Sequence, residues 1–249
     1  MAILNSIRGV CRGIGIGVII AVHLIPIIIG VVFLKKNLAW TLRQRQRIAR
    51  HIVWLLGIKI HQSGTPIDGN FLFIGNHRSY ADPIIAAVSV AFLPVAKAEV
   101  ENWPLLGWGV RITGVLYVKR ENKQSRVDTR NAIRDALSVG DPVLIYPEGT
   151  TSGSVLTLPF RVSAFQVAAE LGVSVVPITL EYGDKEDAWT GTESFVAHFL
   201  NAYGKSKKAV WIDFGTPISD SNWETLLEKT QNAINAKSLD LQKKIAEKG

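Results

Sequence analysis

Residues 71–83 read FLFIGNHRSYADP, and the rest of the chain is organised around this stretch. The apolar run Phe71–Ile74 predicts a buried strand, which the Gly-Asn pair after it ends. His77 then lies at the carboxyl end of that strand, the edge of an open α/β sheet where ligands bind. Asp82 follows on the turn into an apolar helix, so its carboxylate can meet one imidazole nitrogen. The other nitrogen would face the crevice as a general base.

Taken alone, the pair of His77 and Asp82 has two interpretations. It is a catalytic dyad, or it is an aspartate that caps a helix N-terminus beside a surface histidine. The bare spacing does not decide between them, because such a pair also arises by chance. The decision depends on the other strands of the chain.

The composition bounds the class of protein. A chain of 249 residues is enough for one sizeable domain plus an appendage. The single cysteine, Cys11, excludes an internal disulfide and a cysteine-rich metal site. Residues 1–67 carry nine Lys and Arg and no acid, whereas the chain from Asp68 onward carries 19 basic and 21 acidic side chains. This distribution argues against nucleic-acid binding, for which the positive face would lie on the domain itself.

An uncharged apolar run occupies residues 14–34. As a helix these residues span about 31 Å, enough to cross a hydrocarbon core of about 30 Å. The alternatives are a cleaved signal peptide and a buried core helix. The run is long for a signal peptide, and no small-residue cleavage site precedes the basic cluster after it. We therefore expect a membrane-embedded N-terminal helical segment, which either crosses the bilayer or dips in and returns.

The segment from Lys35 to Arg50 holds six basic residues and no acid, with Trp40 and Trp54 nearby. This pattern is typical of an interfacial helix on anionic lipid, and an ordinary solvated amphipathic helix is the alternative. The positive-inside rule places this segment and the domain after it on the cytoplasmic side of the inner (cytoplasmic) membrane. We expect residues 1–62 to form membrane-anchoring and interfacial helices and residues 63–249 to form the enzymatic domain.

The remainder of the chain alternates between strand and helix patterns. This alternation predicts an α/β fold with a mainly parallel mixed sheet flanked by helices on both faces. The expected strands are 71–74, 92–96, 114–118, 143–146, 175–180 and 209–214, and the expected helices are 83–91, 125–138, 160–171 and 221–246.

Further motifs stand at strand ends. The sequence GVLYVKR ends in Arg120, and the apolar strand 143–146 runs directly into Pro147, Glu148 and a glycine turn. Because the carboxyl ends of parallel strands meet at one edge of a sheet, we expect a base, an arginine and a glutamate to line one crevice. This arrangement predicts a site for an acceptor with a hydroxyl and an anionic group, presented at a bilayer surface.

Four motifs of this chain, in their order, resemble those of the lysophosphatidic acid acyltransferases, a family of glycerolipid acyltransferases. The motifs are NHRSYAD (76–82), GVLYVKR (114–120), YPEGT (146–150) and VP (176–177). The resemblance covers about residues 70–180 and is specific because all four motifs occur in order. It implies the glycerolipid acyltransferase fold and acyl transfer from an acyl-carrier-protein or coenzyme A thioester to 1-acyl-glycerol-3-phosphate, which gives phosphatidic acid. It implies no metal, no cofactor beyond the thioester co-substrate and no acyl-enzyme.

The resemblance also implies a role for individual residues. His77 is the base, and Asp82 orients it. The residues implied for binding the acceptor are Arg120, Glu148, Gly149, Thr150 and Arg161.

The chain departs from the family pattern at two positions. Thr151 stands where the third motif commonly has arginine, and Tyr117 stands where the second often has phenylalanine. Losing a cation from the phosphate pocket leaves the acceptor open, although Arg161 matches a basic position downstream and can compensate. We favour lysophosphatidic acid, and another lysolipid such as lyso-ornithine lipid is the alternative.

Functions of two other classes are alternatives to acyl transfer. A serine hydrolase would use Ser79 or Ser152 with His77, but the chain contains no Gly-x-Ser-x-Gly sequence. A lipid-binding relative without catalysis would have no need of the intact set of His77, Asp82, Arg120 and Glu148. Both alternatives are therefore weaker than acyl transfer.

Overall fold

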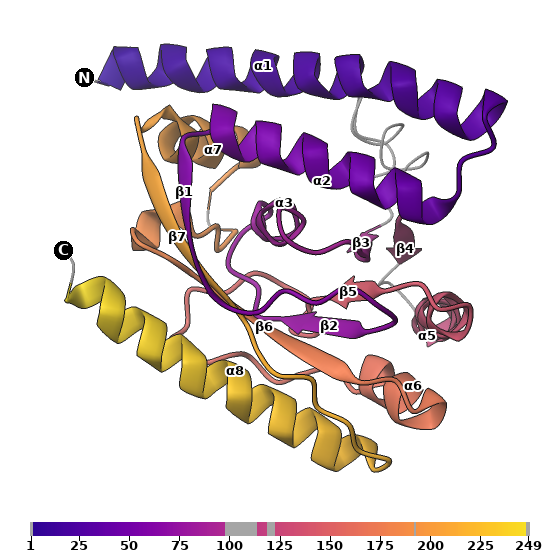
Figure 1. Cartoon of the computed structure of the whole chain (residues 1–249). Helices are drawn as coiled ribbons and strands as arrows, with labels where there is room; N and C mark the ends of the chain where they lie inside the picture. The colour runs from indigo at the N-terminus through magenta and orange to yellow at the C-terminus, as the bar shows by residue number, and fades with distance from the viewer. Residues whose placement is uncertain (1, 98–113, 119–122, 192, 248–249) are drawn as a thin grey trace.

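The computed structural model describes residues 2–97, 114–118, 123–191 and 193–247 (Figure 1). The described strands form one seven-stranded sheet in the order β1-β7-β6-β2-β5-β3-β4. Neighbours pair in parallel except β6 and β7, so β7 and β1 run against the other strands. The strands are β1 (Ile58–Gly64), β2 (Leu72–Gly75), β3 (Leu93–Lys97), β4 (Leu116–Val118), β5 (Val143–Ile145), β6 (Val175–Tyr182) and β7 (Lys208–Phe214).

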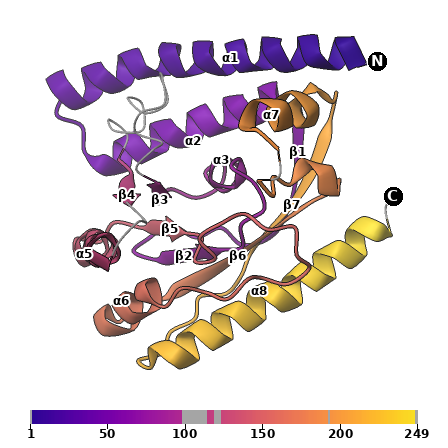
Figure 2. The ribbon, with the colours of Figure 1, turned by 180° about the vertical axis from the view of Figure 1, so that it is seen from behind.

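Helices cover both faces of the sheet (Figures 1 and 2). One hydrophobic cluster packs α2 and α3 against one face, with α7 beside them, and a second packs α5, α6 and α8 against the other. The long helix α1 lies outside the first layer, along α2 and α7. The helices are α1 (Ala2–Ile28), continued by the π-helix η1 (Ile29–Phe33), α2 (Leu38–Leu55), α3 (Asp82–Ala86), α5 (Lys123–Ser138), α6 (Ser163–Leu171), the short 3₁₀-helix η3 (Lys185–Asp187), α7 (Phe195–Gly204) and α8 (Trp223–Ala246).

Strand β2 stands in the interior of the sheet, between β5 and β6. Leu72, Phe73 and Ile74 are fully buried, because both faces of a mainly parallel sheet are covered and the strand must be apolar throughout. The strand delivers His77 to the edge of the sheet at which β5 and β6 also end.

The predicted fold class, a mainly parallel mixed sheet flanked by helices, is confirmed. Strand β1 and helix α7 were not predicted, and the expected helix at 83–91 was too long, because α3 ends at Ala86. Strand β1 pairs with β7 over the whole range from Ile58 to Gly64. This range includes residue 62, where we placed the boundary between the anchor and the domain. That boundary stays a prediction.

Helix α1 and its continuation, Ile3–Phe33, are long and apolar enough to cross a membrane by length and composition. The expected apolar helix is therefore present, and it begins before residue 14 and includes Arg12. The guanidinium of Arg12 is buried and donates to the carbonyl oxygens of Leu55 at 2.9 Å, Tyr203 at 2.8 Å and Ser206 at 3.0 Å. Because these carbonyls stand at the ends of α2 and α7, one arginine of α1 binds two helix C-termini, where a cation is favourable.

Helix α2, for which the interfacial location stays a prediction, also binds the domain. Its Arg45 donates to the carbonyl oxygens of Phe92, at 3.0 Å, and Gly114. Arg50 donates to the carbonyl oxygen of Val88 at 3.2 Å. Two of its arginines thus bind the domain, while Arg43 and Arg47 stay exposed.

Candidate active site

The imidazole of His77 meets the carboxylate of Asp82. His77 Nδ1 lies 2.8 Å from Asp82 Oδ2, and the side chains are 20% and 0% exposed. An ionised carboxylate only accepts hydrogen bonds, so Nδ1 carries the hydrogen and Nε2 keeps its lone pair. The five-residue spacing in the sequence therefore closes into a dyad with one basic nitrogen free for a substrate.

Asp82 is held by more than the histidine. Its Oδ2 also accepts the backbone N–H groups of Arg78 at 2.6 Å and Ser79 at 2.8 Å, and its Oδ1 accepts the hydroxyl of Tyr182 at 2.8 Å. A fully buried carboxylate needs such donors to remain charged. Tyr182 ends β6, the parallel neighbour of β2, so its place at this edge was within reach of the sequence pattern, although we did not predict its role.

The backbone of His77 is fixed by Glu148. The Oε1 atom of Glu148 accepts the N–H of His77 at 2.8 Å, and Oε2 accepts the N–H of Leu158 at 2.9 Å. Burial raises the pKa of the Glu148 carboxyl, against the opposing effect of these two hydrogen bonds. Glu148 thus joins His77 as the sequence predicted, with its oxygens bound to backbone amides. Its expected role in acceptor binding stays a prediction.

Tyr146 fixes the plane of the imidazole ring. The rings of Tyr146 and His77 stack with centroids 4.3 Å apart and an interplanar angle of 15°. Gly75 makes room for this contact, because a Cβ atom there would lie 2.7 Å from Tyr146 Cε1. Burial, and secondarily the charge of Asp82, raises the pKa of the Tyr146 phenol well above its usual value, so the stacking partner is neutral.

Arg161 brings a cation to the turn after Glu148. Its N–H donates to the carbonyl oxygen of Pro147 at 3.0 Å. Its guanidinium lies over Gly149, where a Cβ atom would come within 2.7 Å of Arg161 Cζ and where φ is +77°. The positive φ at this turn favours glycine. Arg161 and Thr150 are exposed here, and Arg120 lies outside the described residues.

The serine hydrolase alternative finds no support at this site. Ser79 is fully buried. Ser152 is 8% exposed, and its Oγ accepts the N–H of Ser154 at 3.0 Å. Neither hydroxyl is presented as a nucleophile beside the free Nε2 of His77.

Residues 57–181 match the sequence model of the acyltransferase family. This match covers half of the chain and includes the dyad and Glu148. The chain belongs to the acyltransferase family. It is an O-acyltransferase, and the resemblance to the lysophosphatidic acid acyltransferases that its motifs indicated is confirmed.

Individual relatives of this acyltransferase carry two different names. A lyso-ornithine lipid O-acyltransferase of Brucella abortus is 25% identical over 82% of this chain and 85% of its own. A chloroplastic 1-acyl-sn-glycerol-3-phosphate acyltransferase of Arabidopsis thaliana is 31% identical over 68% of this chain and 45% of its own. The fold is similar to the crystal structure of the 1-acyl-sn-glycerophosphate acyltransferase of Thermotoga maritima, with a TM-score of 0.67, 17% identity and coverage of 93% of this chain and 98% of that chain.

Proposed function

We propose that this acyltransferase moves an acyl group from an acyl-carrier-protein or coenzyme A thioester to the free hydroxyl of 1-acyl-glycerol-3-phosphate, giving phosphatidic acid in phospholipid biosynthesis. The observation that carries this proposal is the dyad, in which Asp82 occupies Nδ1 of His77 and leaves Nε2 free at the sheet edge. A base at this position can remove the proton of the acceptor hydroxyl and so activate its oxygen for attack.

In the proposed mechanism, Nε2 of His77 takes the proton of the acceptor hydroxyl as its oxygen attacks the thioester carbonyl. The carbon–oxygen bond forms, the carbon–sulfur bond breaks, and the proton passes from His77 to the leaving thiolate. Asp82 keeps the proton on Nδ1 and stabilises the imidazolium that forms between these steps. The products are an acyl ester and a free thiol, and no cofactor takes part.

The acceptor assignment rests on the cation at the turn after Glu148. A phosphate monoester requires charge-assisted donors, and a guanidinium presents two in a fork. Arg161 holds its guanidinium over Gly149, next to the exposed Thr150, and is exposed to solvent itself. We therefore favour lysophosphatidic acid. Lyso-ornithine lipid is the second candidate, because Thr151 replaces the usual arginine and relatives in Brucella abortus and Pseudomonas aeruginosa carry that name.

Replacing Arg161 tests the acceptor. We expect Arg161→Ala to raise the KM for lysophosphatidic acid by about tenfold or more, given about 1.5–3 kcal/mol for a hydrogen bond to a charged group. The kcat should change little, since His77 is untouched. Arg120→Ala should act in the same way. Arg134→Ala is the matched control, because this arginine pairs with Glu170 on the surface. A KM of Arg161→Ala equal to that of Arg134→Ala would refute phosphate recognition by Arg161.

We further propose that α1 lies in the plane of the membrane surface instead of crossing the bilayer. One of its faces packs on the protein through Ile20, Leu24 and Ile27, which are at most 7% exposed. The hydrogen bonds of Arg12 hold this face against α2 and α7. The opposite face exposes large apolar side chains along the whole helix, namely Ile3, Ile7, Val10, Ile14, Val18, Val22, Ile25, Ile29 and Val32. An exposed apolar stripe of this kind suits insertion into one leaflet.

This placement brings the membrane close to the dyad. Tyr80, three residues after His77, shares a hydrogen bond of 3.0 Å with His198 of α7. Helix α7 in turn packs against α1, where Gly9 allows Leu200 to approach closely. The active-site segment is thus separated from the lipid-facing helix by one helix.

Single cysteines outside the apolar stripe provide a test of this placement. Ser6, near the start of α1, and Lys36, just after η1, are both exposed. The helical segment from Ile3 to Phe33 is long enough to cross a membrane. In sealed vesicles we expect a membrane-impermeant maleimide to label Ser6→Cys and Lys36→Cys, each in a Cys11→Ser background, from the same side. Labelling from opposite sides would show a spanning helix.

A further inference from the structure

The loop of residues 152–158 is attached to His77 at both of its ends. At one end, the N–H of Ser152 donates to the carbonyl oxygen of His77 at 2.8 Å. At the other, the N–H of Leu158 binds Glu148 Oε2, while Oε1 of the same carboxylate accepts the N–H of His77. Both peptide groups of the base are thus bonded to this loop, directly or through one carboxylate. A shift of the loop would therefore move the base.

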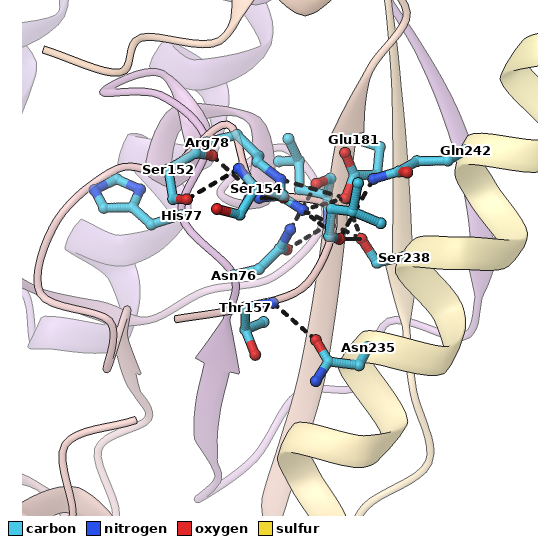
Figure 3. Close-up of polar contacts among 12 residues, drawn as sticks. Asn76, His77, Arg78, Ser152, Ser154, Thr157, Glu181, Asn235, Ser238 and Gln242 are labelled. Atoms are coloured by element: carbon cyan, nitrogen blue, oxygen red, sulfur yellow. Dashed lines mark hydrogen bonds and ion pairs between the residues drawn. The ribbon is translucent and has the colours of Figure 1, made fainter. Parts of the chain in front are cut away.

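Arg78, the neighbour of His77, anchors the middle of this loop. The two side chains point to opposite sides, Arg78 toward α8 and His77 away from it (Figure 3). Arg78 is 2% exposed and donates to the carbonyl oxygens of Ser152 at 3.1 Å and Ser154 at 2.6 Å. Its charge is balanced by Glu181, 2.7 Å away. A buried guanidinium needs such a set of partners, so Arg78 and the loop fix one another.

Helix α8 holds the same loop from the other side with one polar stripe. Asn235 Oδ1 accepts the N–H of Thr157 at 2.9 Å (Figure 3). Gln231 donates to Thr157 Oγ1 at 3.1 Å. Ser238 donates its hydroxyl hydrogen to Glu181, the carboxylate that pairs with Arg78. The stripe, Gln231, Asn235, Ser238 and Gln242, has spacings of four, three and four residues, which place it on one helix face.

We propose that Arg78 and the polar stripe of α8 are positioning residues for catalysis. They hold the loop of residues 152–158, and the loop holds the backbone of His77. None of them touches the substrate, so their loss should lower kcat through a displaced base and leave lysolipid binding unchanged. This inference rests on the proposed role of His77 as the base.

Asn235 is the residue at which to test this inference, because it lies on α8 and its amide oxygen accepts the N–H of Thr157 in the loop. We expect Asn235→Leu in the full-length protein to lower kcat by about tenfold, as small misplacements of catalytic groups do, with KM within about twofold. Asn235→Asp should restore most of the activity, because a carboxylate oxygen accepts the same N–H. Asn232→Leu is the matched control, since this asparagine is exposed on the same helix.

The measurements are kcat and KM for lysophosphatidic acid, with the thermal midpoint of each variant and with His77→Ala alongside. Equal kcat for Asn235→Leu and Asn232→Leu, a raised KM at unchanged kcat, or no recovery in Asn235→Asp would overturn the proposal. If Asn235→Leu is not recovered folded, Gln231→Leu replaces it with the same expected result. An active His77→Ala would refute the assigned base itself, which distinguishes failure of the proposed function from failure of this inference.

Discussion

His77→Ala is expected to abolish acyl transfer while leaving the fold and the membrane attachment intact. The loss of a general base lowers the rate by about 10²–10⁴. The imidazole is partly exposed and belongs to no hydrophobic cluster, so its removal should not unfold the protein. The measurement is turnover of purified full-length protein with a labelled acyl thioester, together with the thermal midpoint and sedimentation with vesicles.

A second histidine serves as the control for this variant. His61 stacks on Trp211 at the edge strand β1, with ring centroids 4.6 Å apart. His61→Ala should keep most of the wild-type turnover. If His77→Ala retained more than about a tenth of wild-type turnover, a value far above that left by removing a general base, His77 would not be the base.

Asp82→Asn is expected to lower kcat by about a hundredfold or more with little change in KM. The carboxylate accepts four donors, from His77, Arg78, Ser79 and Tyr182. An amide has one oxygen, and its NH₂ group can donate to Nδ1 of His77. The hydrogen of the imidazole then moves to Nε2, the nitrogen that must accept the substrate proton.

The same substitution should also lower stability. Buried donors that lose an acceptor are destabilising by about 1–3 kcal/mol each. Tyr182→Phe separates the two effects, because it removes one donor and leaves the tautomer of His77 unchanged. We expect a lowered thermal midpoint with nearly normal kcat for Tyr182→Phe. Equal kcat for the Asp82 and Tyr182 variants would contradict a tautomer-fixing role of Asp82.

The sequence was sufficient to predict the fold class because the strands β2 and β5 are apolar along their whole length and β6 begins with the apolar run 175–178. It was insufficient for β1 and α7, for two physical reasons. Strand β1, IKIHQSG, alternates apolar and polar residues only over 58–61, and it follows closely on the basic helix α2. Helix α7 has only ten residues, so its apolar pattern is too short to distinguish a helix from a strand or loop.

The site was predicted in part for similar reasons. Motifs at the ends of neighbouring parallel strands had to meet, so the proximity of His77 and Glu148 followed from the sheet. The direction of each side chain did not follow. The path of the loop of residues 152–158 determines which backbone N–H groups donate hydrogen bonds to Glu148. The inward direction of Arg78 depends on Glu181, about a hundred residues away in the chain.

The most direct test of the proposed reaction compares two acceptors. Wild-type protein with one acyl thioester should be assayed with lysophosphatidic acid and with lyso-ornithine lipid in the same vesicles, and kcat/KM should be determined for each from the acylated lipid formed. We expect phosphatidic acid to form and lysophosphatidic acid to be preferred. A preference of about tenfold or more for lyso-ornithine lipid, which corresponds to about 1.4 kcal/mol, would contradict the proposed acceptor.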